Sequence, residues 1–384
     1  MKLLIIGDIG IIFTYEYVTE IASKIPDCGI DILSFAPRRE ANIQRENHLA
    51  ALGCRIFYPP KYSLLHRHKL LHILIRLAEA VRYRICRNYD VIHIHFPGAD
   101  SLAVCLWASP KARVITSIYG SDVLRASKRG LSIIEKLLER SNAATVASRY
   151  VKEQVSGKFN ARFDDKTEIV RYGSNAAAYM AKAISGLSKT ECKEQFGFPK
   201  DRLTILCGYN GSRAQRHIEI LNELNRLPHE VQEKLFLVLQ CSYGFDETYQ
   251  KELSDALAAS PLDGVIVTDF MQGEILAKFR NSMDVFLNLQ PTDVLSATMI
   301  EELEAGAIVV KGDWLCYPDL TERNVYLRSI ADMRLLSSEV EDIAGHYSQE
   351  RTKAAANRGI CEILSWEAQY SEWKRIILNT TNDK

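Results

Sequence analysis

The chain has 384 residues, of which 47% are hydrophobic and 25% are charged. That composition is ordinary for a globular protein and excludes disorder, collagen and a coiled coil, while the length predicts two or three domains. Basic and acidic residues number 48 each, and this zero net charge argues against a general nucleic-acid binder.

The zero net charge is the sum of two unlike halves. Residues 1–173 hold 26 basic and 17 acidic residues, a charge of +9, and residues 174–384 hold the other 22 and 31, a charge of −9. A basic half and an acidic half predict two domains with different partners.

The cysteines and the apolar runs predict a cytoplasmic protein. Nine cysteines are scattered along the chain without a C-x-x-C pair or zinc spacing, which is typical of reduced thiols. The apolar run at Leu3–Ile6 is too short for a signal peptide and suits a buried strand. The sequence contains no run of 18 apolar residues, so it predicts no transmembrane helix.

In the first half, short apolar runs alternate with amphipathic stretches. The predicted strands are Leu3–Ile6, Ile30–Ser34, Val91–His95, Val114–Ile118 and Ala144–Ala147, and the strand pattern pauses after Glu168-Ile169-Val170. Helical patterns lie between them, at Glu16–Lys24, Leu70–Arg87 and Leu131–Arg140. This alternation predicts an α/β fold with a doubly wound parallel sheet and helices on both faces.

A second series of the same kind predicts a second Rossmann-like half. Its strands are Leu203–Cys207, Leu235–Gln240, Gly264–Thr268, Val285–Leu289 and Ala307–Val310. Its helical patterns are His217–Leu227, Glu247–Ala258, Glu274–Asn281 and Thr298–Ala305. We expect a hinge near Gly173, because glycine permits a bend, between domains at 1–173 and 174–360. Two such sheets facing each other predict a ligand cleft beyond the carboxyl ends of the strands.

The most informative stretch follows the predicted strand Val285–Leu289. Seven residues separate Asp293 from Glu301, and the small-residue loop Ser296-Ala297-Thr298 leads into a helix. Such a loop presents backbone N–H groups to an anion, particularly a phosphate. Glu301, one turn inside the helix, is placed to accept hydrogen bonds from sugar hydroxyls. An alternative is that Thr298 and Glu301 form a T-x-x-E capping box.

This stretch resembles the E-x(7)-E signature of the retaining family 4 glycosyltransferases, which have the GT-B fold. Asp293 stands where the family has its first Glu, and Glu301-Glu302-Leu303-Glu304-Ala305-Gly306 follows the rest of the pattern. The resemblance implies that Glu301 holds the ribose hydroxyls of a nucleotide. It also implies that Asp293 contacts the donor sugar, with one methylene less reach than Glu.

Two further segments of the second half complete the expected donor site. In Gly208–His217, the side chains of Arg213, Arg216 and His217 are candidates to neutralise a diphosphate. This loop lacks the usual family Lys and resembles the Gly-Asn-Ser-Gly…His loop of the transferase that adds N-acetylfucosamine in enterobacterial common antigen. A solvated helix start is the alternative.

The segment expected to read the nucleobase follows the strand Gly264–Thr268. Thr268-Asp269-Phe270-Met271 resembles the family segment whose backbone contacts the base, and Tyr243 is a further candidate for lining the same pocket. A simple strand-to-helix turn is the alternative for this segment.

In the first half, Tyr119-Gly120-Ser121-Asp122 resembles the family's His-Gly-x-Asp segment, with Tyr in place of His. The resemblance implies that Tyr119 and Asp122 bind hydroxyls of the acceptor or donor; the alternative for Asp122 is a helix N-cap. Gly10 ends a Gly-x-x-Gly loop that resembles the family's loop near the diphosphate. His93 and His95 share one face of a strand, where core packing or cleft lining is favoured over metal binding.

Two features of the sequence bear on cofactors and on membrane binding. No Asp-x-Asp motif occurs, so we expect neither a metal nor another cofactor. Residues 61–87 carry seven basic residues and one acid among leucines, which predicts a basic amphipathic helix that binds an anionic membrane surface. A domain helix with a charged outer face is the alternative.

The whole pattern leads to a retaining GT-B glycosyltransferase. Ser365-Trp366-Glu367 resembles the family's closing Ser-Trp-Glu, which implies that a C-terminal helix at 361–384 crosses back to the first domain. We expect a nucleotide-sugar donor, with UDP as its nucleotide, and a glycan or lipid-linked glycan acceptor from a bacterial capsule or O-antigen pathway. The alternatives are a UDP-sugar 2-epimerase of the same fold and a non-catalytic nucleotide-sugar-binding subunit.

Overall fold

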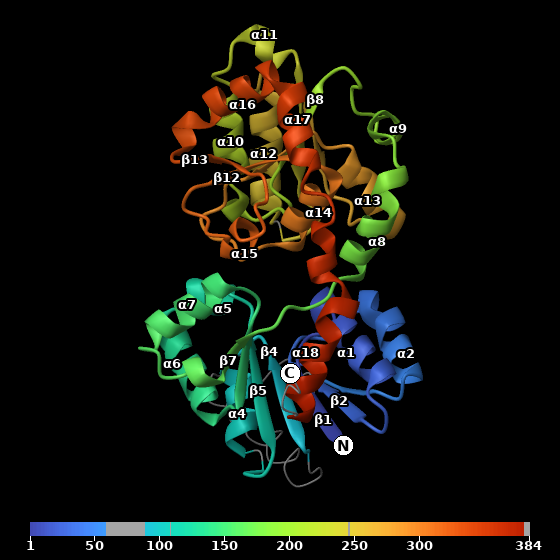
Figure 1. Cartoon of the computed structure of the whole chain (residues 1–384), viewed down its shortest axis with the longest axis vertical. Coiled ribbons are helices and arrows are strands. Elements are labelled where there is room, and N and C mark those ends of the chain that lie inside the picture. Colours follow the sequence, from blue (N-terminus) through green and yellow to red (C-terminus); the bar gives the residue numbers. More distant parts are fainter. Residues whose placement is uncertain (59–88, 108, 245, 380–384) are drawn as a thin grey trace. The chain divides into compact units, whose positions relative to one another are not determined.

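The computed structural model describes residues 1–58, 89–107, 109–244 and 246–379, so the expected basic helix at 61–87 lies outside the described residues. The chain divides into two compact units (Figure 1). Unit 1 consists of Met1–Gly173 and the residues from Trp366 onward, and unit 2 is Ser174–Ser365. Over the described ranges, no helix is long and apolar enough to cross a membrane.

Unit 1 contains a parallel sheet of seven strands in the order β3-β2-β1-β4-β5-β6-β7. The strands are β1 Lys2–Ile6, β2 Gly29–Leu33, β3 Arg55–Phe57, β4 Val91–His95, β5 Arg113–Ile118, β6 Ala143–Val146 and β7 Thr167–Ile169. All five strands expected in this half are confirmed. The other two strands lie at the sheet edges and have three residues each. β7 lies where the strand pattern pauses, and β3 was missed, because three residues are too few for a periodic signal.

Helices surround this sheet, and the last helix of the chain is one of them. They are α1 Ile12–Lys24, α2 Ile43–Ala51, α4 Ala99–Trp107, α5 Ser121–Leu124, α6 Lys128–Arg140, α7 Arg149–Lys158 and α18 Trp366–Leu378. Figure 1 shows α18 beside α1. The fully buried Trp373 of α18 packs edge-on to Tyr17, with ring centroids 5.0 Å apart, and donates a hydrogen bond of 2.8 Å to the carbonyl of Arg171.

The helix that returns to unit 1 begins at Trp366, and the residues before it belong to unit 2. Ile360–Leu364 form a 3-10 turn in which Cys361 is fully buried in the core of unit 2. The Cys361 N–H donates a hydrogen bond of 2.9 Å to the Glu304 carboxylate. The expected boundary at 360 is therefore corrected to 365, because this turn is bonded to unit 2.

Unit 2 repeats the topology of unit 1 with six parallel strands in the order β10-β9-β8-β11-β12-β13. The strands are β8 Leu203–Cys207, β9 Leu235–Gln240, β10 Gly264–Val267, β11 Val285–Asn288, β12 Ile308–Gly312 and β13 Arg328–Ile330. The helices are α8 Asn175–Ala183, α9 Lys189–Gln195, α10 His217–Leu224, α11 His229–Gln232, α12 Glu247–Ala258, α13 Gly273–Asn281, α14 Ala297–Ala305, α15 Pro318–Thr321, α16 Leu336–Gly345 and α17 Tyr347–Ala355. The five expected strands are confirmed, and the three-residue edge strand β13 was missed.

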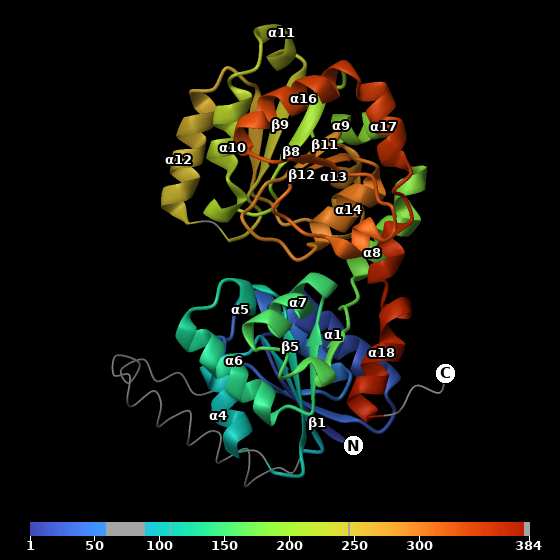
Figure 2. The same cartoon turned by 60° about the vertical axis from the view of Figure 1, so that its left-hand side comes forward.

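The sheet of unit 2 is covered on both faces, which is why its strands are continuous apolar runs. Side chains of β8 alternate between two core clusters: Ile205 and Cys207 pack with α10, α12 and α16, while Leu206 packs with α8, α13 and α14. Figure 2 shows α10, α12 and α16 together on one side of the sheet. This packing leaves the loops at the carboxyl ends of the strands as the place where polar side chains converge.

Candidate functional site

Most residues expected to bind the donor lie after four neighbouring strands of unit 2, in the loops or at the start of helix α14. Gly208–Arg216 follows β8, Tyr243 follows β9, Phe270 and Met271 follow β10, and Asp293 follows β11. The carboxyl ends of parallel strands meet at one edge of a sheet, the usual ligand-binding edge of such folds. The loops are joined there by a hydrogen bond of 2.7 Å from the Gly211 N–H to the Tyr243 carbonyl.

Asp293 is 7% exposed and is held through one carboxylate oxygen. Its Oδ2 accepts hydrogen bonds from the Tyr317 hydroxyl at 2.7 Å, the Asn288 amide at 3.0 Å and the Ser296 N–H at 3.4 Å. Three donors on one oxygen fix the orientation of the carboxyl group. Asp293 is therefore suited to accept hydrogen bonds from a ligand through its other oxygen.

Glu301 is equally buried and is held by an arginine from another helix. Its Oε2 accepts a hydrogen bond of 2.9 Å from Nε of Arg280, which lies near the end of α13. Arg280 also donates to the Thr298 hydroxyl at 3.1 Å, so that one guanidinium connects two residues of α14. The pairing brings together the expected donor-binding residues Thr298 and Glu301.

The start of α14 has a different cap from the one in the alternative interpretation. Ser296 is the N-cap, and its hydroxyl accepts a hydrogen bond of 3.3 Å from the Met299 N–H. Thr298 bonds to Arg280 instead, so the T-x-x-E capping box of Thr298 with Glu301 is wrong. Ser296 and Ala297, both half-buried, lie at the N-terminus of the nine-residue helix α14, as expected.

The Gly208–His217 loop does not present all its expected cations. Arg213 makes a bidentate ion pair with Glu252 of α12, at 2.6 and 2.8 Å, and lies over the Tyr249 ring. Arg216 lies over the Trp314 ring and donates to the Leu289 carbonyl at 3.3 Å. Arg216 is thus the arginine of this loop that has no acidic partner among the residues described.

His217 is fully buried, and its Nδ1 lies 3.2 Å from the Tyr249 hydroxyl. Burial lowers the pKa of His217 to about 4, so the imidazole is uncharged at neutral pH. This pKa does not favour a positive charge on His217 beside a diphosphate, and its role in donor binding stays a prediction. Gly208 lies close to the His217 ring: a Cβ at position 208 would be 2.8 Å from Nε2 of His217. This close approach explains the glycine after β8.

The expected nucleobase segment borders a cavity of about 480 Å³ beside β10. Phe270 and Met271 line it, together with Phe196 and Phe198 from the segment after α9. Tyr243 is 50% exposed and meets the half-exposed Phe270 edge to face, with ring centroids 6.4 Å apart. The structure therefore brings Tyr243, Phe270 and Met271 together at one apolar edge of unit 2.

In unit 1, Tyr119 and Asp122 lie just after β5. The Tyr119 ring stacks between Phe96, at 3.9 Å between centroids, and Tyr172, at 5.0 Å. The Asp122 carboxylate accepts a hydrogen bond of 2.8 Å from the Tyr119 N–H, and burial raises the pKa of Asp122 to about 6. Asp122 is the second residue of the short helix α5, and Gly120 holds the N-cap position that the alternative gave to Asp122.

Gly10 lies between β1 and α1, where it closes a tight turn. Its N–H donates to Oδ1 of Asp8 at 2.8 Å, and its carbonyl accepts a hydrogen bond of 2.8 Å from Arg45. A Cβ on Gly10 would lie 3.0 Å from side-chain atoms of Asp8 and Asn42. The turn therefore needs a small residue whether or not a diphosphate binds beside it.

His93 and His95 of β4 belong to a buried hydrogen-bond network. His93 bonds to the Tyr17 hydroxyl at 2.8 Å and the Ser117 hydroxyl at 2.7 Å, and His95 Nδ1 lies 3.1 Å from the Tyr119 hydroxyl. Burial lowers the pKa of His95 to about 3 and that of His93 well below its usual range. Both rings are neutral core residues, which agrees with the core packing favoured from the sequence.

We predict that unit 1 loses stability as the pH falls below about 6.5. The unfolded histidines take up protons there and the buried ones do not, so the free energy of unfolding falls by up to about 1.4 kcal/mol per pH unit for each histidine. Urea unfolding between pH 7 and pH 4 measures this slope. The His93→Gln variant should show a smaller dependence of the free energy of unfolding on pH. An equal slope in that variant would contradict the conclusion that His93 is buried as a neutral ring.

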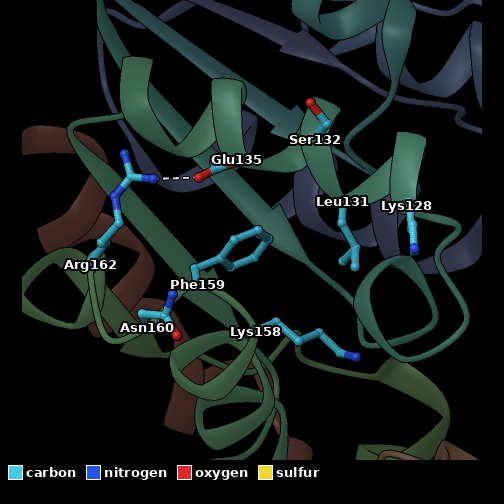
Figure 3. Close-up of a pocket in the computed structure, with 8 residues that line it drawn as sticks. All are labelled: Lys128, Leu131, Ser132, Glu135, Lys158, Phe159, Asn160 and Arg162. Carbon is cyan, nitrogen blue, oxygen red and sulfur yellow. Dashed lines mark hydrogen bonds and ion pairs between the residues drawn. The ribbon is translucent and has the colours of Figure 1, made fainter.

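A second cavity, of about 240 Å³, lies in unit 1 between α6 and the turn after α7 (Figure 3). The ion pair of Arg162 with Glu135 crosses its rim. Its other lining residues are Lys128, Leu131, Ser132, Lys158, Phe159 and Asn160. None of the residues expected to bind donor or acceptor lines this cavity.

The residues that support the two acids were missed in the sequence. Asn288 ends β11 and Gln240 ends β9, and polar residues at strand ends are a signal that would have found them. Arg280 and Tyr317 carry no such signal, because an arginine in an amphipathic helix and a tyrosine in a loop normally indicate exposed positions.

Comparisons with known proteins agree with this architecture. Residues 16–175 match the model of Glycosyltransferase Family 4. A comparison with curated proteins finds no match. Three similar solved structures each align over 99% of this chain and 100% of the other chain. They are HepE from Anabaena in complex with UDP (13% identity, TM-score 0.74) and sucrose-phosphate synthase from Thermosynechococcus elongatus (13% identity, TM-score 0.72). The third is UDP-GlcNAc 2-epimerase from Neisseria meningitidis bound to UDP-GlcNAc (12% identity, TM-score 0.64). The expected GT-B fold, with two Rossmann-like α/β units, is therefore confirmed.

Proposed function

We propose that the protein is a retaining glycosyltransferase that moves a sugar from a UDP-sugar to a glycan or lipid-linked glycan. The observation that carries the proposal is the pair of buried acids at one edge of unit 2. Oδ2 of Asp293 accepts hydrogen bonds from three donors, and Oε2 of Glu301 accepts one from Arg280. Their spacing matches the family signature, and the family match and the UDP-bound GT-B structures support a nucleotide-sugar donor.

The side chains suit a division of labour within the donor site. Glu301 accepts hydrogen bonds from the ribose, Asp293 accepts one from a hydroxyl of the transferred sugar, and Arg216 neutralises the diphosphate as it leaves. Phe270 and Met271 flank the base. The loop resembles that of an N-acetylfucosamine transferase, which makes an N-acetylated sugar a candidate for the donor.

The proposed reaction needs no protein nucleophile. The bond from the anomeric carbon to the diphosphate oxygen breaks, its electron pair leaves with UDP, and the acceptor hydroxyl attacks on the same face. The acceptor proton passes to the departing phosphate oxygen. Tyr119 and Asp122 are the unit 1 residues proposed to bind hydroxyls, and a capsule or O-antigen glycan is the proposed acceptor.

Nucleotide binding tests the proposal. We expect UDP and one UDP-sugar to raise the melting temperature in a thermal-shift screen, because a ligand of the native state stabilises it by mass action. Glu301→Gln should weaken UDP binding by about 30-fold. Glu304→Gln, a buried acid on the same helix whose carboxylate bonds to the Gly359 and Cys361 N–H groups, is the control that should keep the affinity.

Two outcomes would decide against the proposal. An unchanged affinity in Glu301→Gln would remove Glu301 from the nucleotide site. Conversion of UDP-N-acetylglucosamine to its 2-epimer without any acceptor would favour the epimerase, which shares the fold. Slow release of UDP from a UDP-sugar in the absence of acceptor would argue against a non-catalytic subunit.

A further inference from the structure

Arg280 is a buried cation at a helix position where arginine normally faces solvent. Its side chain is 4% exposed, and its donors are directed at four side chains from two elements, β9 and α14. They reach Glu301 and Thr298, described above, Oε1 of the Gln240 side chain at 2.9 Å and Oε1 of Glu302 at 3.3 Å. The guanidinium therefore connects the end of β9 with the helix that carries Glu301.

Glu302 is the unusual member of this cluster. It is fully buried, and its second oxygen, Oε2, has no hydrogen-bond partner among the residues described. Burial raises the pKa of Glu302 to about 8, against the opposing influence of Arg280. The raised pKa favours the protonated form of Glu302 at neutral pH, while Oε2 of Glu301 accepts the hydrogen bond from Nε of Arg280.

The other charged group that faces Glu302 comes from α9. Lys189 lowers the pKa of Glu302, and the Glu301 carboxylate raises it. Lys189 is already engaged, since its ammonium donates to the Met283 carbonyl and lies 3.6 Å from the Asp284 carboxylate. When Glu302 ionises, it therefore competes for Arg280, whose Nη1 already lies 3.3 Å from its Oε1.

We propose that Arg280 is a positioning residue of the nucleotide site and that it aligns the Glu301 carboxylate only while Glu302 keeps its proton. An ionised Glu302 competes for the guanidinium and repels Glu301, which then loses the direction that the bond to Nε imposes. The inference rests on the proposed function, because the measured quantity is UDP affinity. It adds a control of that affinity by pH.

The test is UDP affinity by titration calorimetry between pH 6.5 and pH 9.5. In the wild type we expect the affinity to fall by about tenfold as Glu302 ionises. Glu302→Gln, which keeps the shape and removes the titration, should bind UDP within about twofold of the wild type at pH 7 and lose most of this fall. Titration of UDP itself is common to both proteins and cancels in the comparison.

Variants of Arg280 separate positioning from simple stability. Arg280→Gln should weaken UDP binding at pH 7 by about tenfold or more. Arg280→Lys should retain part of the affinity that Arg280→Gln loses. The matched control is Arg328→Gln, because Arg328 of β13 pairs with Glu339, Asp342 and Glu350 in the same unit. This control should lower the melting temperature without changing UDP affinity.

The outcomes distinguish the two proposals. A wild type that binds no UDP would overturn the proposed function, and the inference with it. A wild type that binds UDP, with the same pH dependence in Glu302→Gln, would overturn the inference alone. Wild-type affinity in Arg280→Gln would do the same.

Discussion

Replacing Asp293 by asparagine is expected to reduce sugar transfer by about 10² to 10³-fold while UDP affinity changes little. The carboxylate is directed by the Tyr317, Asn288 and Ser296 donors, and the proposed contact of Asp293 is with the sugar, not the nucleotide. An amide of the same shape keeps the packing and loses the charge. Release of UDP from the UDP-sugar found in the binding screen measures the effect.

Two further variants test the role of Asp293. Tyr317→Phe removes one of the three donors to Oδ2 and should cost about tenfold in transfer, less than the loss of the charge. Asp313→Asn changes a 55% exposed acid of the same unit and should leave transfer unchanged. Full activity in Asp293→Asn, or a loss of UDP affinity as large as that of Glu301→Gln, would contradict the assigned role.

Replacing Gly173 by alanine is expected to destabilise unit 1 by about 3 kcal/mol. A Cβ at this position would lie 2.3 to 2.7 Å from three ring atoms of Trp366. The indole has little room to move, because it is 4% exposed and its Nε1 donates a hydrogen bond of 3.3 Å to Glu16. Urea unfolding followed by tryptophan fluorescence measures the change.

Gly157 provides the matched control for this substitution. It lies within α7, and a Cβ there would meet no atom within 4 Å. Gly157→Ala should therefore be neutral or stabilising, by up to about 1 kcal/mol, because alanine favours the helix. If Gly173→Ala is as stable as Gly157→Ala, Trp366 is not held in place by the contacts of this structure.

Much of the fold was predictable because it depends on local pattern. Ten strands were expected and all ten form, since a strand covered on both faces by helices is mostly apolar and shows as a short apolar run. The missed strands β3 and β13 have three residues each and form because each pairs with a neighbouring strand of the sheet. A short strand has too few residues to show a period.

The candidate site was predictable in its acids and less so in its cations. Asp293 and Glu301 were found because their spacing around a strand, loop and helix is a property of the sequence itself. The charges of Arg213 and His217 depend on distant partners: Glu252 holds Arg213, and burial beside Tyr249 keeps His217 neutral. Neither partner is adjacent in the sequence.

The sequence by itself determined the two sheets, the opposite charges of the two halves and the place of the acidic pair at the end of β11. Only the tertiary structure decided which groups surround that pair. Arg280 lies 21 residues before Glu301 and reaches it because α13 and α14 cover the same face of the sheet. Periodicity records which face of a helix is apolar, whereas the partner of a buried charge depends on how the helices pack.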